Sequence, residues 1–165
     1  ALALRAVNDS LRLNIEDYIV VNMRGMEQLV DLAGGIMVDV TDGELPYLNL
    51  NLNEENLLYP DTTQSKPLTS PGLQLLDGRQ SVAYARIRHL DNDYKRMARQ
   101  RTVLQALFTK FKADNVVTKA NVVSKGLSFI TTSLTDAEIT DMALSIFPLM
   151  ASEIDQLQIP IKGYY

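Results

Sequence analysis

The spacing of hydrophobic positions changes several times along the chain and divides it into expected helices and strands. A helical spacing of leucine and valine predicts a helix over residues 1–12. Short β-branched runs at 18–22 and 36–40 predict strands, and the amphipathic stretch between them predicts a helix that ends near Gly34. This strand–helix–strand order favours a mixed or parallel sheet with helical cover, and therefore an α/β fold.

Residues 41–71 depart from this pattern. Four of the six prolines fall there, together with several asparagines and little hydrophobic periodicity. We therefore expect residues 41–71 to form a long surface excursion within a single domain that spans residues 1–165.

Regular elements resume after the excursion. The pattern predicts a strand at 72–76, a short helix capped by Asp77, the longest helix at 93–113 and another helix at 118–130.

The last part of the chain carries signals for one more helix and one more strand. Thr135 and Glu138 have the spacing of a capping box, which predicts a helix start. Pro148 is expected to kink or end that helix, and residues 157–161 are expected to form an edge strand.

The composition fits one globular domain and narrows its chemistry. The chain has 165 residues, 46% of them hydrophobic, and a formal net charge of −4. It contains no cysteine, which excludes a disulfide, a thiolate zinc site and a cysteine nucleophile. The chain opens already in a helical pattern, so we expect upstream sequence in the complete protein.

Positive charge is concentrated in one short stretch. Residues 86–101 contain six basic and two acidic residues, a local net charge of +4, whereas the remainder of the chain carries −8. A nucleic-acid-binding protein usually spreads its positive charge more widely. The concentration therefore indicates a local site for an anion.

The predicted helix at 93–113 supports this interpretation. One face of it is apolar from Leu104 to Phe111 and is expected to be buried. The same face carries Asp93, Arg96 and Gln100 over its first two turns. Polar groups at the mouth of a core, beside a helix N-terminus, are typical of an anion pocket.

Arg86 and Arg88 precede this helix. If their segment is extended, both guanidinium groups point the same way and face Arg96, which would give a bidentate clamp for phosphate or pyrophosphate. The alternative is that these arginines are solvated or paired with carboxylates, as most surface arginines are. His89 is the only histidine and is more typical of a structural than a catalytic residue. The carboxylates show no metal-ligand spacing, so no metal site is expected from this chain alone.

The segment DGRQSVAYARIRHLDNDYKRMARQRTVLQAL resembles the signature of the LytR-CpsA-Psr family, and VDLAGGIMVDV at 30–40 is similar to the strand approach of that family. The matching positions are Leu76, Asp77, Gly78, Ala83, Tyr84, Arg86, Arg88, Asp93, Arg96, Arg99 and Gln100. The resemblance covers about residues 1–150 and implies a mixed central sheet flanked by helices, here without the upstream part of the catalytic domain.

The resemblance also implies a function. Family members are extracytoplasmic, typical of Gram-positive bacteria and anchored in the membrane by an N-terminal helix, which we expect upstream of this chain. They are phosphotransferases that move a glycopolymer, of teichoic acid or capsular polysaccharide type, from a polyprenyl pyrophosphate carrier to peptidoglycan. The product is a phosphodiester.

Residue roles follow from the resemblance. Arg86, Arg88 and Arg96 are expected to bind the pyrophosphate, and Asp93 to position an arginine or assist proton transfer. Arg99 and Gln100 are expected to bind substrate. Mg²⁺ is expected as a cofactor, with ligands in the upstream segment, so activity would require that segment.

Two other functions stay open at this point. A non-catalytic module that binds polyprenyl phosphate, or regulates through it, would use the same arginines. Nucleic-acid binding is the third possibility, and the acidic remainder of the chain argues against it.

Overall fold

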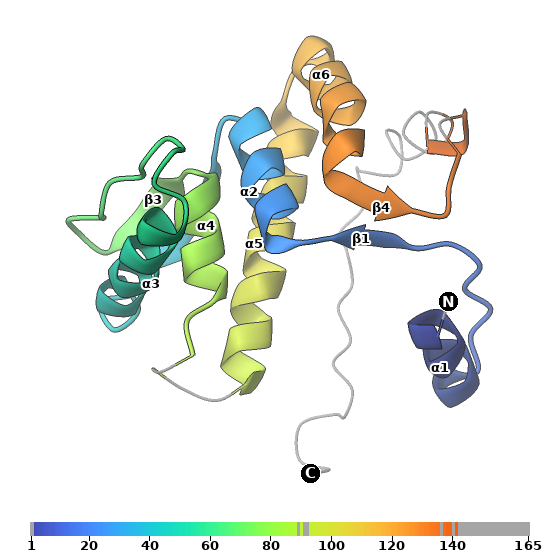
Figure 1. Ribbon diagram of the computed structural model, residues 1–165, viewed down its shortest axis with the longest axis horizontal. Helices are drawn as coiled ribbons and strands as arrows, with labels where there is room; N and C mark the ends of the chain where they lie inside the picture. The colour runs from blue at the N-terminus through green and yellow to red at the C-terminus, as the bar shows by residue number, and fades with distance from the viewer. Residues whose placement is uncertain (1, 89, 91–92, 136, 140, 142–165) are drawn as a thin grey trace. The chain divides into compact units, whose positions relative to one another are not determined.

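The computed structural model describes residues 2–88, 90, 93–135, 137–139 and 141. The chain divides into two compact units, residues 1–133 and 134–165, and all elements named here belong to the first (Figure 1). In chain order they are α1 (Leu2–Leu11), β1 (Ile19–Val21), α2 (Met23–Leu32), β2 (Ile36–Val40), α3 (Leu45–Leu58), β3 (Gly72–Leu76), α4 (Gly78–Ala85), α5 (Asp93–Ala113), α6 (Val116–Gly126), the 3₁₀ turn η1 (Leu127–Phe129) and β4 (Ile130–Thr132).

The α/β class is confirmed, but the strands pair differently from the expectation. β1 pairs antiparallel with β4, with Ile19 opposite Thr132. β2 pairs antiparallel with β3, with Ile36 opposite Leu76. Among the described residues, the strands at 18–22 and 36–40 therefore lie in two separate small sheets. The strand–helix–strand pattern could not reveal this, because each strand finds its partner much later in the chain.

Local capping explains where the central helices begin and end. Asn22 caps α2 by accepting a hydrogen bond from the backbone N–H of Gly25. Gly34, with φ of 78°, follows the end of α2 in the left-handed region, as the sequence predicted. Asp77 and Gln80 form a reciprocal capping box at the start of α4.

The core lies between β2, α3, α4 and α5. Along β2 the side chains alternate, and Ile36, Val38 and Val40 are almost fully buried. α4 is buried along its whole length, with α2 and α3 packed against it (Figure 1). Burial of each large aliphatic side chain contributes about 1.5–3 kcal/mol to stability, so this cluster positions the adjacent polar groups firmly.

The segment at 41–71 is not the irregular excursion that the sequence predicted, because residues 45–58 form α3. Pro46 stands in its first turn, where proline favours a helix start. Leu48, Leu52 and Glu55 are buried at helical spacing. A helix with a short apolar stripe and many asparagines gives a weak periodic signal, which explains the error.

The asparagines in this region anchor the loop that follows α3. Asn49 exchanges two hydrogen bonds of 2.9 Å with the backbone of Leu68. Asn56 exchanges two with the backbone of Ser65, of 2.9 and 3.3 Å. These paired contacts satisfy backbone groups that a strand or helix would otherwise satisfy.

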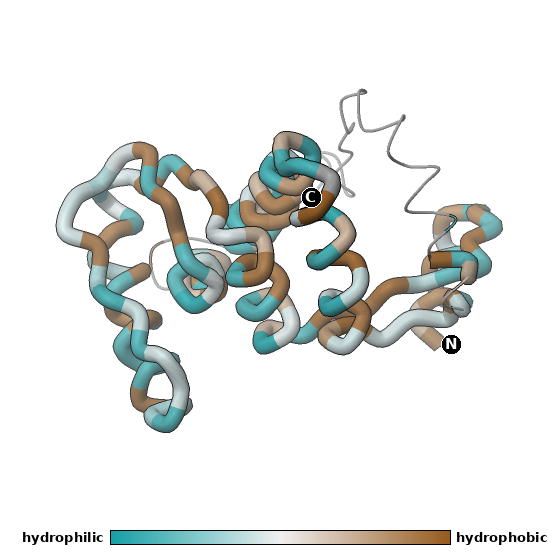
Figure 2. Tube along the Cα trace, turned by 90° about the horizontal axis from the view of Figure 1, so that it is seen from above, coloured by the Kyte–Doolittle hydropathy of each residue, from teal (hydrophilic) through white to brown (hydrophobic). Residues whose placement is uncertain are grey.

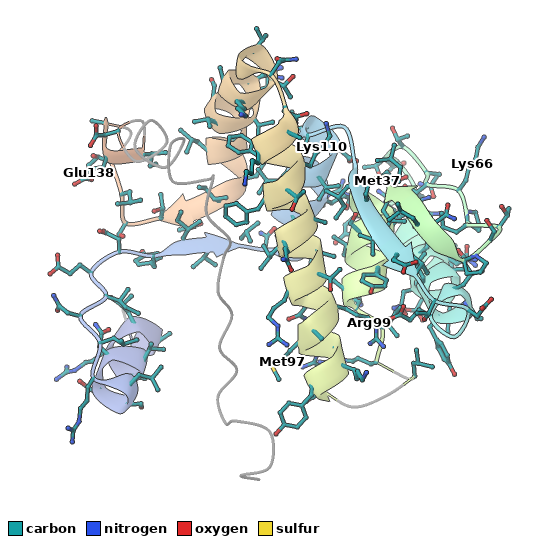
Figure 3. The ribbon with its side chains drawn as sticks, turned by 180° about the vertical axis from the view of Figure 1, so that it is seen from behind. Met37, Lys66, Met97, Arg99, Lys110 and Glu138 are labelled. Atoms are coloured by element: carbon teal, nitrogen blue, oxygen red, sulfur yellow. The ribbon has the colours of Figure 1, made fainter. Side chains whose placement is uncertain are left out.

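α5 has the predicted bounds, but its predicted apolar face is buried only in part: Leu107 packs against the core. Leu104 is 42% exposed and Phe108 is 48% exposed, whereas Val103 is 2% exposed and packs in the core. Figure 3 shows Arg99 and Met97 leaving α5 in different directions, and only Arg99 is buried. Large hydrophobic side chains are exposed in other elements too, for example Leu73 and Leu75 in β3. Figure 2 shows hydrophobic and hydrophilic residues interspersed along the described trace.

The C-terminal expectations are met only in part. The helix predicted at 118–130 is present as α6, Val116–Gly126. The last four residues of the predicted range instead form η1 and the start of β4. Thr135 and Glu138 make the predicted capping contacts, with the Thr135 N–H donating to Glu138 Oε2 at 2.8 Å. Pro148 and residues 157–161 lie outside the described residues, as does His89.

Candidate anion-binding site

A pocket of about 370 Å³ brings together four of the predicted site residues. It is lined by Met23, Asn51, Glu54, Arg86, Arg88, Arg96 and Gln100. These side chains come from the start of α2, from α3, from the end of α4 and the loop after it, and from the first two turns of α5. The lining is mostly polar and carries three guanidinium groups, which suits an anionic ligand.

Arg86 enters the pocket from the C-terminal end of α4. Its backbone angles, φ −91° and ψ −3°, are helical, so the extended backbone on which the clamp geometry was conditional is not present at Arg86. The end of the buried helix, rather than a strand, directs Arg86 toward the pocket that Arg88 also lines. Nη1 of Arg86 forms an ion pair with Oε1 of Glu55, a buried carboxylate on α3.

Arg96 and Asp93 pair across one turn at the start of α5. Nη1 of Arg96 lies 2.9 Å from Oδ1 of Asp93, whose side chain is 74% exposed, while that of Arg96 is 21% exposed. Nε of Arg96 is buried and has no hydrogen-bond partner among the described residues. Asp93 thus pairs with Arg96, and a role for either side chain in binding a ligand stays a prediction.

Gln100 lines the pocket one turn after Arg96, but Arg99 does not line it. Arg99 is 4% exposed. Its Nε donates to Oε1 of Glu44 at 2.7 Å, and its Nη1 donates to the Ile87 carbonyl at 3.2 Å. These contacts tie α5 to the connection between β2 and α3. Direct substrate binding by Arg99 therefore stays a prediction from the resemblance.

The Arg99 cluster has a defined electrostatic character. Burial opposes ionisation of Glu44, but hydrogen bonds from Arg99 and Thr41 outweigh it and lower the pKa of Glu44. Burial, together with the nearby Glu44 carboxylate, raises the pKa of Tyr84 to about 12. Glu44 is therefore an ionised partner for Arg99 at neutral pH.

The sequence interpretation missed Asn51, Glu54 and Glu55, because it treated their helix as an irregular segment. The spacing of Leu48, Leu52 and Glu55 is the signal that would have found them.

It also missed a second buried arginine. Arg79, 2% exposed, donates from Nε to Glu27 Oε1 at 3.2 Å and from Nη1 to Asn56 Oδ1 at 2.9 Å. Glu27 in turn accepts from Arg24 Nη1 at 2.9 Å. This network links α2, α3 and α4. Residues of α2 and α3 also line the pocket.

The described part of the chain contains neither a cluster of metal-binding side chains nor a helix suited to crossing a membrane. No three histidine, cysteine or acidic side chains within it lie together as a metal site. The Mg²⁺ ligands expected in an upstream segment stay a prediction. None of the described helices combines the length and the hydropathy that crossing a membrane requires.

The model of the LytR_cpsA_psr family matches residues 1–165. The chain belongs to the LytR_cpsA_psr family. Biofilm regulatory protein A of Streptococcus mutans is 33% identical over 77% of this chain and 29% of its own length. The polyisoprenyl-teichoic acid--peptidoglycan teichoic acid transferase TagU of Enterococcus faecalis is 30% identical over 78% of this chain and 37% of its own length.

A solved structure shares this fold. The structure of TagT bound to LIIa-WTA superposes with a TM-score of 0.65 at 24% identity, over 92% of this chain and 51% of that chain. At this identity the likeness shows the shared fold alone. This chain spans about a third to a half of the length of these family members.

Proposed function

We propose that this chain is part of a transferase that moves a glycopolymer from a polyprenyl pyrophosphate carrier to peptidoglycan. The observation that carries the proposal is the pocket lined by Arg86, Arg88, Arg96 and Gln100. The name of the TagU relative supports both the reaction type and a teichoic acid donor. Capsular polysaccharide is the other donor class that the family resemblance allows.

The reaction needs charge stabilisation more than a covalent nucleophile. A sugar hydroxyl of peptidoglycan attacks the phosphorus that carries the glycopolymer, and the bond from that phosphorus to the bridging oxygen breaks. The products are a phosphodiester and polyprenyl monophosphate, and the hydroxyl proton leaves to a base or to water. Guanidinium groups stay protonated at every working pH, so Arg86, Arg88 and Arg96 would neutralise the charge that develops on the leaving phosphate.

The other pocket residues would support the clamp. Asp93 would hold Arg96 in its orientation, as their 2.9 Å contact indicates. The Gln100 amide would donate one hydrogen bond to a phosphate oxygen. Mg²⁺ would be held by residues of the upstream segment.

The location follows from the same proposal. A polyprenyl carrier is embedded in the membrane and peptidoglycan lies outside it, so the site would work on the extracytoplasmic face. An anchor upstream of this chain would keep it near the carrier.

Native mass spectrometry with a polyprenyl pyrophosphate tests the proposal. We expect an adduct on the wild-type chain, its loss in Arg88→Ala and its retention in Arg101→Ala, a matched arginine that does not line the pocket. Loss in both variants, or in neither, would contradict an anion site at this pocket.

Regulation is the second candidate function, favoured by the name of the Biofilm regulatory protein A relative. Such a module would bind polyprenyl phosphate through the same arginines without transfer. A protein extended by its upstream segment, assayed with Mg²⁺ and peptidoglycan acceptor, separates the two. Turnover supports the transferase, and tight binding without turnover supports the regulator.

A further inference from the structure

Two neighbouring carboxylates on α3 have opposite surroundings. Glu54 is exposed and lines the arginine pocket. Glu55 is 6% exposed and forms an ion pair with Nη1 of Arg86. Leu48 and Leu52, both fully buried, lie on the same face of α3 as Glu55 and fix the helix against the core. The Glu55 carboxylate is therefore held at a defined place, whereas Glu54 is exposed at the pocket lining.

Arg86 lies between this carboxylate and the pocket. Its side chain is 40% exposed, so burial by its neighbours does not fix it. A guanidinium has five N–H donors in a planar fork, and contact with one carboxylate leaves donors for a second acceptor. α3 and α4 are further joined by a hydrogen bond of 3.0 Å from Asn51 to the Ala83 carbonyl, three residues before Arg86. The ion pair thus joins two helices that also pack together and share a hydrogen bond.

We propose that Glu55 is a positioning residue that holds the Arg86 guanidinium in its ligand-binding orientation. This inference rests on the proposed function, because it assigns the partner of a residue in the same anion pocket. Glu55 does not line the pocket and acts through Arg86. Because Glu55 already orients Arg86, the arginine side chain loses less conformational entropy when it binds an anion.

Charge alone predicts the opposite effect. A carboxylate near an anion site repels the ligand, so removing its charge would tighten binding. Removing the charge of Glu55 also releases Arg86, which would weaken binding. The sign of the effect of Glu55→Gln therefore separates a positioning role from a bystander charge, and Glu54→Gln supplies the matched case in which repulsion alone is removed.

Calorimetry with inorganic pyrophosphate as the probe tests the inference. We expect Glu55→Gln to bind about tenfold more weakly than wild type, which is the size of one lost charged hydrogen bond. We expect Glu54→Gln to bind slightly more tightly, and Asn53→Ala, an exposed change on the same helix, to bind as wild type does. Unchanged or tighter binding by Glu55→Gln would overturn the inference.

A double-mutant cycle shows whether Glu55 acts through Arg86. In an Arg86→Met background, Glu55→Gln should cause no further loss of pyrophosphate binding. Additive losses would overturn the positioning role. If Arg86→Met weakens binding while Glu55→Gln does not, the anion pocket stands and only this inference fails. If the wild type does not bind pyrophosphate, the proposed function fails and the inference fails with it.

A measurement on the wild type covers the case in which Glu55→Gln does not fold. The Arg86 guanidinium resonances, assigned with Arg86→Lys, should show slow rotation of the paired Nη group. Free rotation of that group would overturn the inference whatever the variants do.

Discussion

Nε of Arg99 donates to Oε1 of Glu44 at 2.7 Å, although the two residues are 55 positions apart in the chain. The side chains are 5% and 11% exposed. The pair joins α5 to the connection between β2 and α3, next to the first turns of α5 that line the anion pocket. Removing one partner of a buried pair leaves an uncompensated charge, which costs far more than losing a surface ion pair.

Glu44→Gln is therefore expected to lower the free energy of unfolding by about 3 kcal/mol. The neutral amide in this variant would remove the carboxylate charge that the buried Arg99 Nε contacts. Urea unfolding followed by circular dichroism measures the change. The control is Arg5→Ala, because Arg5 and Asp9 form a pair whose side chains are 83% and 75% exposed. Its midpoint should not shift measurably, and equal shifts in the two variants would contradict this account of Arg99.

The same pair predicts a pH dependence. Hydrogen bonds from Arg99 and Thr41 outweigh the effect of burial and lower the folded-state pKa of Glu44 below its ordinary value of 4.5. The unfolded state then binds more protons in this range, so the stability from this group is present above pH 4.5 and is lost as pH falls through the lowered pKa.

Urea midpoints between pH 3 and pH 7 should therefore fall more steeply on the acid side for wild type than for Glu44→Gln. Burial raises the pKa of Asp31, so that group acts in the opposite direction. The comparison with Glu44→Gln cancels its contribution. Parallel profiles for the two proteins would show that Glu44 does not titrate as described.

The close approach of α2 and α4 depends on a glycine. A Cβ atom at Gly78 would lie 2.0 Å from the carbonyl oxygen of Glu27, so the helices would have to separate. We expect Gly78→Ala to cost about 3 kcal/mol of stability, at the upper end for overpacking, because the obstacle is backbone. Gly43→Ala is the matched control, since among the described residues its Cβ would meet Leu90 alone, at an ordinary 3.9 Å. A wild-type Tm for Gly78→Ala would contradict this packing.

The sequence predicted the elements that have strong local signals. Strands with β-branched residues, the Asp77 cap and the long helix from Asp93 were placed to within a few residues. Strand pairing was not predictable, because β1 and β4 are separated by more than a hundred positions. α3 was missed because its apolar stripe is short and its asparagines resemble loop residues until their backbone partners are known.

In the candidate site too, residues with a local sequence signal were predicted and residues that depend on distant contacts were not. The charge pattern and the helical spacing of Arg96 and Gln100 pointed to residues that do line one pocket. Helical spacing did not include Arg99 on that face, and Arg99 became a substrate-binding candidate only through the family resemblance. One position along a helix turns a side chain by about 100°, which separates Arg99 from Gln100. The pattern could not find Glu55, since the partner of Arg86 lies on an element with no basic residues.

Arg96 gives the sharpest test of whether geometry or charge governs the pocket. Its Nη1 is held by Asp93, and its Nε is buried without a partner among the described residues. Lysine keeps the charge but loses the planar donors, so Arg96→Lys should weaken pyrophosphate binding about tenfold. Arg101→Lys, on the same helix but outside the pocket lining, should leave binding unchanged. Calorimetry at low and at physiological salt makes the comparison. If Arg96→Lys binds as tightly as wild type at both salt concentrations, the pocket attracts anions by charge alone and the guanidinium geometry has no role.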